Sequence, residues 1–118
     1  MEHWTPEEYR NYINRKEKKG KYRNQKTEVD GHVFDSKAEA DRYSNLKLME
    51  RSGLIKGFMI QPSFYLTAGI RYRADFLVCG ADGNIWAEDV KGIETKEFKI
   101  KKKLFNRKYP WLELRVKG

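Results

Sequence analysis

Two aspartates and a lysine in the second half of the chain, Asp75, Asp89 and Lys91, are of the types that gather around a cation. Two carboxylates held ~5 Å apart at an effective dielectric constant near 20 repel each other by about 3 kcal/mol. If the fold places Asp75 beside Asp89, either Lys91 neutralises the pair or a divalent metal ion binds there. The alternative is a surface cluster of ion pairs with no chemical role.

A three-stranded meander is the simplest arrangement that would position these residues. The two turns between its strands both have the form x-x-Gly, which fits a three-residue hairpin loop closed by a residue in the left-handed region. The strands are predicted over Phe58–Leu66, Ile70–Cys79 and Asn84–Lys91, with turns at 67–69 and 81–83.

One row of polar residues crosses this predicted meander. Counting back from the turns places Gln61 opposite Asp75, and Asp75 opposite Asp89. The alternation of side chains along a strand adds Lys91 to the same face, so we expect the core on the other face. The alternation also places Glu88 on the apolar face, where the sequence indicates no partner for it.

A helix predicted over residues 37–52 adds a third carboxylate, Glu39. Ser36 and Glu39 form a capping box at its start, and Gly53 marks its end. Glu39 also falls within the apolar arc that should face the sheet. It is therefore either the capping-box acceptor or a third acid of the site, and the two roles are compatible.

The remaining elements complete a mixed α/β (α+β) pattern. Asp30-Gly31 is typical of a tight hairpin turn, and Pro110 marks the end of a late helix. The elements are a hairpin of Thr27–Val29 and His32–Phe34, a helix from Thr95 to about Tyr109, and a strand over Trp111–Lys117. A helix over Pro6–Lys19 belongs to a basic N-terminal arm, residues 1–21, which precedes a single domain over residues 22–118.

The composition excludes several classes of protein. With 118 residues the chain is long enough for one core, and its one cysteine, Cys79, excludes an internal disulfide and a structural zinc site. Neither a phosphate-cradling loop nor a dinucleotide fingerprint is present, so we expect no nucleotide cofactor. The apolar runs are too short to span a membrane and the start lacks a secretion signal, so we expect a soluble intracellular protein without a membrane partner.

The charge of +8 is concentrated at the two ends of the chain. Residues 1–26 carry eight basic and four acidic groups, residues 27–90 carry seven and ten, and residues 91–118 carry ten and three. Basic ends favour a polyanionic partner, because each lysine or arginine placed on a phosphate releases condensed counterions.

These features together resemble the PD-(D/E)XK nuclease superfamily. Its signature is matched by Asp75 on one strand, Asp89-Val90-Lys91 on the next and Glu39 on the preceding helix, with Ala74 in place of the nominal proline. The order helix, three-strand meander, helix, strand is similar to the restriction-endonuclease-like core, a mixed sheet flanked by helices. The resemblance covers about residues 22–117. Segments 34–40 and 88–92 resemble a phage-borne branch related to Holliday-junction resolvases.

The resemblance implies a metal-dependent DNA endonuclease. Asp75, Asp89 and the Val90 carbonyl would hold Mg²⁺, for which Mn²⁺ would substitute, and Glu39 would complete or bridge the site. Lys91 would orient or activate the attacking water and offset developing negative charge. Gln61 would hold a water next to the metal, or is a plain polar strand residue before Pro62.

The basic residues of the late helix and of the N-terminal arm are expected to bind DNA. One face of the late helix points toward solvent. Lys101 instead lies within the arc of apolar residues, from which its long side chain could reach a substrate phosphate. The expected DNA-binding residues are Lys96, Lys99, Lys101, Lys103 and Arg107 on the helix and Arg15, Lys16, Lys18, Lys19, Lys21 and Arg23 in the arm.

The resemblance to resolvases implies that the substrate is branched DNA and that the protein is a homodimer. It also implies that the protein acts in the cytoplasm of a bacterial host. Two active sites related by a two-fold axis would cut two opposed strands of a junction. Two alternatives remain: a DNA- or RNA-binding accessory protein whose acidic row is a structural ion-pair cluster, and an RNA-directed nuclease of the same fold.

Overall fold

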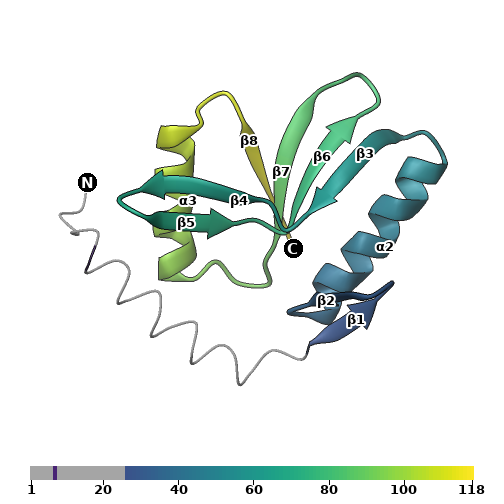
Figure 1. The fold of residues 1–118 in the computed structure, drawn as a ribbon, viewed down its shortest axis with the longest axis horizontal. Helices are drawn as coiled ribbons and strands as arrows, with labels where there is room; N and C mark the ends of the chain where they lie inside the picture. The colour runs from purple at the N-terminus through teal and green to yellow at the C-terminus, as the bar shows by residue number, and fades with distance from the viewer. Residues whose placement is uncertain (1–6, 8–25) are drawn as a thin grey trace.

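A computed structural model describes residue 7 and residues 26–118 of the chain (Figure 1). Over these residues the protein is mixed α/β, with two helices beside a mixed four-stranded sheet, as predicted. The strands are β1 (Thr27–Val29), β2 (His32–Phe34), β3 (Ile55–Ile60), β4 (Ser63–Thr67), β5 (Ile70–Arg73), β6 (Phe76–Gly80), β7 (Ile85–Val90) and β8 (Glu113–Lys117), and the helices are α2 (Lys37–Arg51) and α3 (Lys96–Lys108).

The basic arm predicted over residues 1–21 lies outside the described residues, except for Glu7, which is helical and exposed. Neither α2 nor α3, the helices of the described part of the chain, is long and apolar enough to cross a membrane.

The four-stranded sheet has the order β3-β6-β7-β8. Its first three strands are antiparallel, whereas β8 runs parallel to β7, and α3 forms the connection between these two strands. A parallel pair needs such a crossover, because a tight turn can join only antiparallel neighbours.

Adjacent residues of the sheet pack against different helices. Phe76 and Val78 on β6 are fully buried in a core with α2, whereas Leu77 between them packs against a second core that contains α3. The sheet is thus covered on both faces, as its unbroken apolar runs require.

Local sequence signals set the ends of both helices. Ser36 accepts a hydrogen bond from the backbone N–H of Glu39 at the start of α2, and Thr95 accepts one from Phe98 at the start of α3. Each such cap stabilises a helix by about 1 kcal/mol. Gly53, with φ +83°, follows the C-cap of α2, in agreement with the predicted stop.

Two of the predicted turns form as expected. Asp30 and Gly31 both have positive φ and join β1 to β2. The backbone N–H of Gly80 donates to the carbonyl of Asn84 at 2.8 Å, which closes the loop at 81–83 and sets the register of β6 with β7.

The turn predicted at 67–69 is shorter in the structure. Thr67 pairs with Ile70, so only Ala68 and Gly69 form the turn, both with positive φ, and a bulge before Thr67 absorbs the extra residue. The prediction was wrong about the loop length, but the bulge leaves the register beyond it unchanged.

The prediction of continuous strands over 58–66 and 70–79 was also wrong. Each is broken in the middle, because Gln61 takes a positive φ of 52° and Pro62 supplies no backbone donor. The hairpin β4–β5 therefore leaves the sheet and packs over α3, as Figure 1 shows. Phe64 on this hairpin contacts Phe105 of α3 with ring centroids 5.0 Å apart.

Candidate active site

The row of residues predicted from the turns is present at the point where the strands bend. The pairings Ile60 with Phe76 and Phe76 with Glu88 lead directly to Gln61, Asp75 and Asp89. The backbone N–H of Gln61 donates to the carbonyl of Asp75 at 2.8 Å. The break in the strands thus leaves the backbone register unchanged and places Asp75 beside the bend.

Asp75 is partly buried, and its carboxyl group lies among other acids. Its Oδ2 accepts the backbone N–H of Val90 at 2.7 Å. Burial, then the charges of Asp89 and Glu39, raise the pKa of Asp75 to about 9. In the absence of a metal ion Asp75 therefore holds a proton at neutral pH.

Asp89 is almost completely buried on β7, with 1% of the residue exposed. Its Oδ2 accepts a hydrogen bond from the hydroxyl of Tyr72 on β5, and its Oδ1 lies 3.2 Å from Nζ of Lys91. Within the described part of the chain this Oδ1 accepts no hydrogen bond, so its contact with Lys91 is an ion pair only.

Lys91 lies between the carboxylates and the first turn of α3. Its ammonium group is 5.0 Å from the centre of the Phe98 ring, and 34% of its side chain is exposed. Burial alone would lower the pKa of Lys91, but the charge of Asp89 outweighs it and raises the pKa. Lys91 is therefore an ammonium ion throughout the neutral pH range.

Glu39 forms the predicted cap of α2, and its carboxyl group interacts electrostatically with Asp35 and Asp89. Its backbone N–H donates to Ser36 Oγ at 3.1 Å, and the same hydroxyl donates to Glu39 Oε1 at 3.5 Å. Burial, followed by the charge of Asp35, raises the pKa of the Glu39 carboxyl group. The cap thus fixes the backbone position of Glu39 at the start of α2.

Gln61 is in the row by its backbone, but its side chain turns toward another element. Its amide Nε2 donates to the carbonyl of Val33 on β2 at 3.3 Å. The positive φ of Gln61 accounts for this direction, because the strand alternation that placed the side chain with the carboxylates ends at the bend. Gln61 ties β2 to the bend instead.

The sequence did not point to Tyr72, whose hydroxyl fixes one oxygen of Asp89. Burial, then the charge of Asp89, raises the pKa of Tyr72, so the hydroxyl keeps its proton and acts as the donor. Tyr72 lies on β5, in the hairpin that leaves the sheet at the bend and packs over α3. The alternation of apolar and polar residues along the sequence does not indicate this change of direction.

The partner of Glu88 is Arg42, on the other face of the sheet from Asp89. Arg42 donates to both carboxylate oxygens of Glu88, at 2.8 and 2.7 Å, and Trp86 Nε1 donates to Oε2 at 2.8 Å. Burial opposes ionisation of Glu88, but these donors, led by Arg42, lower its pKa. No local spacing in the sequence indicates this pair, because Arg42 and Glu88 are 46 residues apart.

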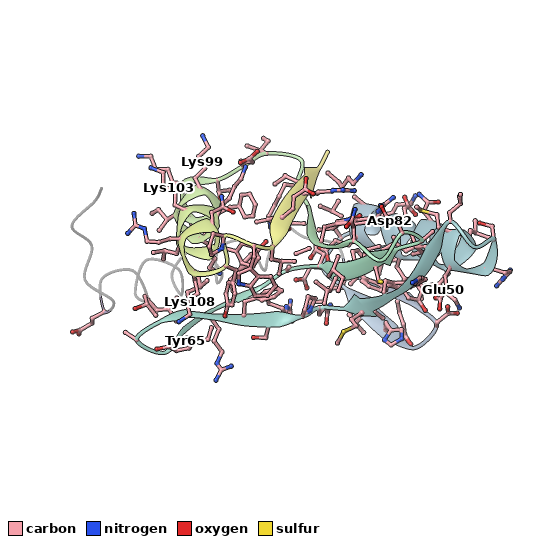
Figure 2. The ribbon with its side chains drawn as sticks, turned by 90° about the horizontal axis from the view of Figure 1, so that it is seen from above. Glu50, Tyr65, Asp82, Lys99, Lys103 and Lys108 are labelled. Atoms are coloured by element: carbon pink, nitrogen blue, oxygen red, sulfur yellow. The ribbon has the colours of Figure 1, made fainter. Side chains whose placement is uncertain are left out.

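Four of the five expected DNA-binding residues of α3 are exposed. Figure 2 shows Lys99 and Lys103 pointing outward from the helix, on the side away from Tyr65 and Lys108. Lys96 and Arg107 are also exposed, whereas Lys101 is half-buried, in agreement with its expected inward position. The six basic residues expected in the arm, Arg15, Lys16, Lys18, Lys19, Lys21 and Arg23, lie outside the described residues.

The donors at the bend suit a hard divalent cation, although they do not form a ready-made cage. Two carboxylates and a backbone carbonyl match the preference of Mg²⁺ for a few protein oxygens plus water. The buried Asp89 Oδ1 without a donor is an atom that such an ion would satisfy. Among residues 26–118, no group of three or more His, Cys, Asp or Glu side chains is arranged to bind a metal ion directly.

Comparison with known proteins gives one match. No curated protein and no solved structure matches the chain. A family model described as a protein of unknown function, DUF1064, matches residues 19–117, a span that contains Glu39, Asp75, Asp89 and Lys91. Since the match covers most of the sequence, the chain belongs to the DUF1064 family.

Proposed function

We propose that the protein is a Mg²⁺-dependent DNA endonuclease that hydrolyses phosphodiester bonds in branched DNA. The observation that carries the proposal is the convergence of Glu39, Asp75, Asp89 and Lys91 at the bend of the strands. Asp75, whose pKa is raised to about 9 by burial and by the charges of Asp89 and Glu39, is a position where a cation can replace a proton.

Asp75, Asp89 and the Val90 carbonyl would hold the metal ion, with Glu39 completing the site. When bound, Mg²⁺ would polarise the scissile phosphate and lower the pKa of a bound water. Asp75 would give up its proton on binding, so metal affinity should rise with pH. Tyr72 keeps the Asp89 carboxylate in a fixed orientation.

Lys91 contributes positive charge to this reaction. Because its pKa is raised, it cannot take a proton from water at neutral pH. Its ammonium group, 3.2 Å from Asp89, can orient the attacking water and offset the charge that develops on the phosphate. Of the two roles expected for Lys91, orientation is therefore favoured over activation as a base.

The choice of DNA rests on α3 and on the resemblance to resolvases. The exposed lysines of α3 begin one turn from Phe98, which contacts Lys91, so they can guide a nucleic-acid backbone toward the carboxylates. Branched DNA, a homodimer and the cytoplasm of a bacterial host are what the similarity to phage-borne resolvases implies.

The test is a panel of labelled four-way junction, flap, duplex and single-stranded DNAs, with matched RNAs, each with Mg²⁺, with Mn²⁺ and with a chelator. We expect metal-dependent cleavage of branched DNA, abolished by Asp75→Asn and reduced about 100-fold or more by Lys91→Ala. Lys56→Ala, an exposed lysine on β3, is the matched control. Cleavage that survives Asp75→Asn would refute the proposed site.

A nucleic-acid-binding accessory protein is the second candidate, and one observation favours it. Lys91, Tyr72 and the Val90 N–H already partner the two aspartates without a metal ion. On this alternative the wild type would bind DNA or RNA with a steep salt dependence but cut none of the substrates. Asp75→Asn would then leave binding unchanged.

A further inference from the structure

The carboxylate of Asp35 lies between two exposed cations. Its Oδ1 is 3.9 Å from Nζ of Lys26, and its Oδ2 accepts a hydrogen bond from Nη2 of Arg73 at 3.2 Å. Lys26 precedes β1, Asp35 follows β2, and Arg73 ends β5, so three separate segments of the chain meet at this carboxylate. We name Lys26 and Arg73 the cation pair.

The cation pair lies close to the proposed metal ligands. Asp35 is four residues before Glu39, and its charge contributes to the raised pKa of Glu39. Arg73 is two residues before Asp75, so the Cα atoms of these two residues are at most about 7 Å apart. Successive phosphates of one DNA strand are separated by a similar distance. A phosphate on the cation pair would therefore adjoin a phosphate at the carboxylates.

The ion pairs of Asp35 are exposed, so they contribute little to the stability of the fold. The side chains of Lys26 and Arg73 are each 56% exposed, and that of Asp35 is 41% exposed. Water solvates such charges almost as well as their partners do. The buried pair of Arg42 with Glu88 already fixes α2 against the sheet. The contacts of Asp35 can therefore be exchanged for others at little cost.

A DNA phosphate suits the cation pair better than the Asp35 carboxylate does. Arg73 contacts this carboxylate through Nη2, whereas a guanidinium group can hold a phosphate through two parallel hydrogen bonds. Each phosphate that is placed on a lysine or arginine also releases condensed counterions, which a single carboxylate does not carry. Displacement of Asp35 by a phosphate is therefore favourable.

The acids of the candidate active site give the cation pair a use. Asp75 and Asp89 bring carboxyl groups to the bend, and Lys91 is already paired with Asp89. A DNA strand that reaches a metal ion there places its neighbouring phosphates close to carboxylates. Positive charge beside those phosphates lowers the repulsion. The cation pair supplies this charge once Asp35 no longer neutralises it.

We propose that Lys26 and Arg73 bind the DNA phosphate next to the scissile one, and that Asp35 occupies their site until DNA displaces it. Asp35 is then a stand-in for a phosphate, and the cation pair positions the strand to be cut. The identity of the neighbouring phosphate as the scissile one rests on the proposed nuclease function, whereas binding of a phosphate by the cation pair does not.

The test is the affinity for a labelled four-way junction, measured by fluorescence anisotropy in a chelator at about 0.15 M salt. We expect Arg73→Ala and Lys26→Ala each to weaken binding about 3- to 10-fold and to lower the slope of log K against log salt by about 0.9. Asp35→Asn removes the competing carboxylate and should tighten binding about 3- to 10-fold.

The opposite signs of these effects distinguish the proposal from a structural role. If the ion pairs served to hold α2 against β5, Asp35→Asn would weaken binding as Arg73→Ala does, and the proposal would be overturned. No change on Asp35→Asn would overturn it as well. The urea midpoint of each variant should match that of the wild type, because the substituted side chains are exposed, and a clear fall would assign the ion pairs to the fold.

Matched controls separate the cation pair from a general effect of charge. Asp41→Asn removes an aspartate from the exposed pair with Lys37, and Arg51→Ala removes an exposed arginine at the other end of α2. Each should change the affinity by less than about 2-fold.

The coupling between Asp35 and the cation pair is the sharpest prediction. In a protein that carries both Lys26→Ala and Arg73→Ala, Asp35→Asn should change the affinity by less than about 2-fold, because the carboxylate no longer competes for anything. A gain in affinity that persists in this protein would overturn the displacement of Asp35.

Cleavage assays distinguish failure of this proposal from failure of the nuclease proposal. Arg73→Ala should raise the DNA concentration for half-maximal cleavage about 3- to 10-fold and leave the rate at saturating DNA within about 3-fold, because Arg73 holds the strand and not the reacting atoms. If no substrate is cut but the binding results hold, the nuclease proposal fails and the phosphate site stands. If branched DNA is cut but these variants bind as the wild type does, the reverse is true.

Discussion

At the scale of single residues, the candidate site depends on the side chains that contact the Asp89 carboxylate. The carboxylate is buried, and only Tyr72 and Lys91 compensate its charge among the contacts described above. A buried carboxylate without compensating partners is strongly disfavoured, so these two side chains fix its direction.

Tyr72→Phe should remove one donor from Asp89 without leaving a cavity. We expect the free energy of unfolding to fall by about 1–3 kcal/mol, because Oδ2 stays buried without a partner. We also expect the concentration of Mg²⁺ needed for half-maximal cleavage to change, because the direction of Asp89 is no longer fixed. Urea denaturation and metal titration measure the two effects, with Ser63→Ala on exposed β4 as the control. An unchanged stability would show that the hydroxyl does not serve Asp89.

The pKa of Asp75 predicts a pH dependence of stability in the absence of metal. Its pKa is about 9 in the folded protein and 3.8 in the unfolded chain, so between these values the folded state binds the extra proton. Stability in a chelator should therefore fall as the pH rises from about 4 to about 9. Asp75→Asn should flatten this part of the profile, as thermal unfolding at a series of pH values would show. A wild-type profile that rises with pH over this window would contradict the shift.

At the scale of elements, strand β7 contributes both to the candidate site and to the packing of α2, because its adjacent residues face opposite sides of the sheet. Asp89 faces Tyr72 and Lys91, whereas Glu88 faces Arg42 on α2. The ion pair of Arg42 with Glu88 fixes α2 against the sheet, and α2 carries Glu39 one turn away. The position of the third acid thus depends on a contact that takes no part in the chemistry.

Arg42→Leu should destabilise the protein by about 3–5 kcal/mol, because it leaves Glu88 buried and uncompensated. The double variant Arg42→Leu with Glu88→Leu should recover much of this loss, since neither charge remains. Lys37→Ala breaks the exposed pair of Lys37 with Asp41 on the same helix and should cost less than about 1 kcal/mol. Urea denaturation measures all three. A double variant as unstable as Arg42→Leu alone would mean that packing, and not charge, explains the loss.

At the scale of the whole molecule, charge of opposite sign is separated. The acids gather where the strands bend, while α3 carries basic residues from its first turn to its last. A polyanion is therefore attracted to the helix, whereas at the bend it meets carboxylates, and a metal ion is needed there to admit its phosphate.

The proposed action on two opposed strands predicts two chains on each junction. Sedimentation of the protein with a four-way junction in a chelator should give the mass of a dimer on one DNA molecule. A complex with a single chain would exclude the dimer, while leaving cleavage of one strand possible.

Much of this molecule follows from local sequence. Local signals were sufficient to predict α2, α3, the hairpin of β1 and β2, and the register that places Asp75 opposite Asp89, although not the break at Gln61-Pro62. These signals are the turns at Asp30-Gly31 and at 81–83, the caps at Ser36 and Thr95, and the alternation of side chains. These signals act between residues that are close in the chain, where backbone geometry alone determines the outcome.

Only the tertiary structure decided which side chains complete the site. The bend at Gln61-Pro62 carries Tyr72 to Asp89 and turns the Gln61 side chain toward β2, and packing of α2 pairs Arg42 with Glu88. These contacts join residues far apart in the chain. They depend on how the elements pack, and hydrophobic periodicity identifies a face of an element but not the polar partner that will lie opposite it.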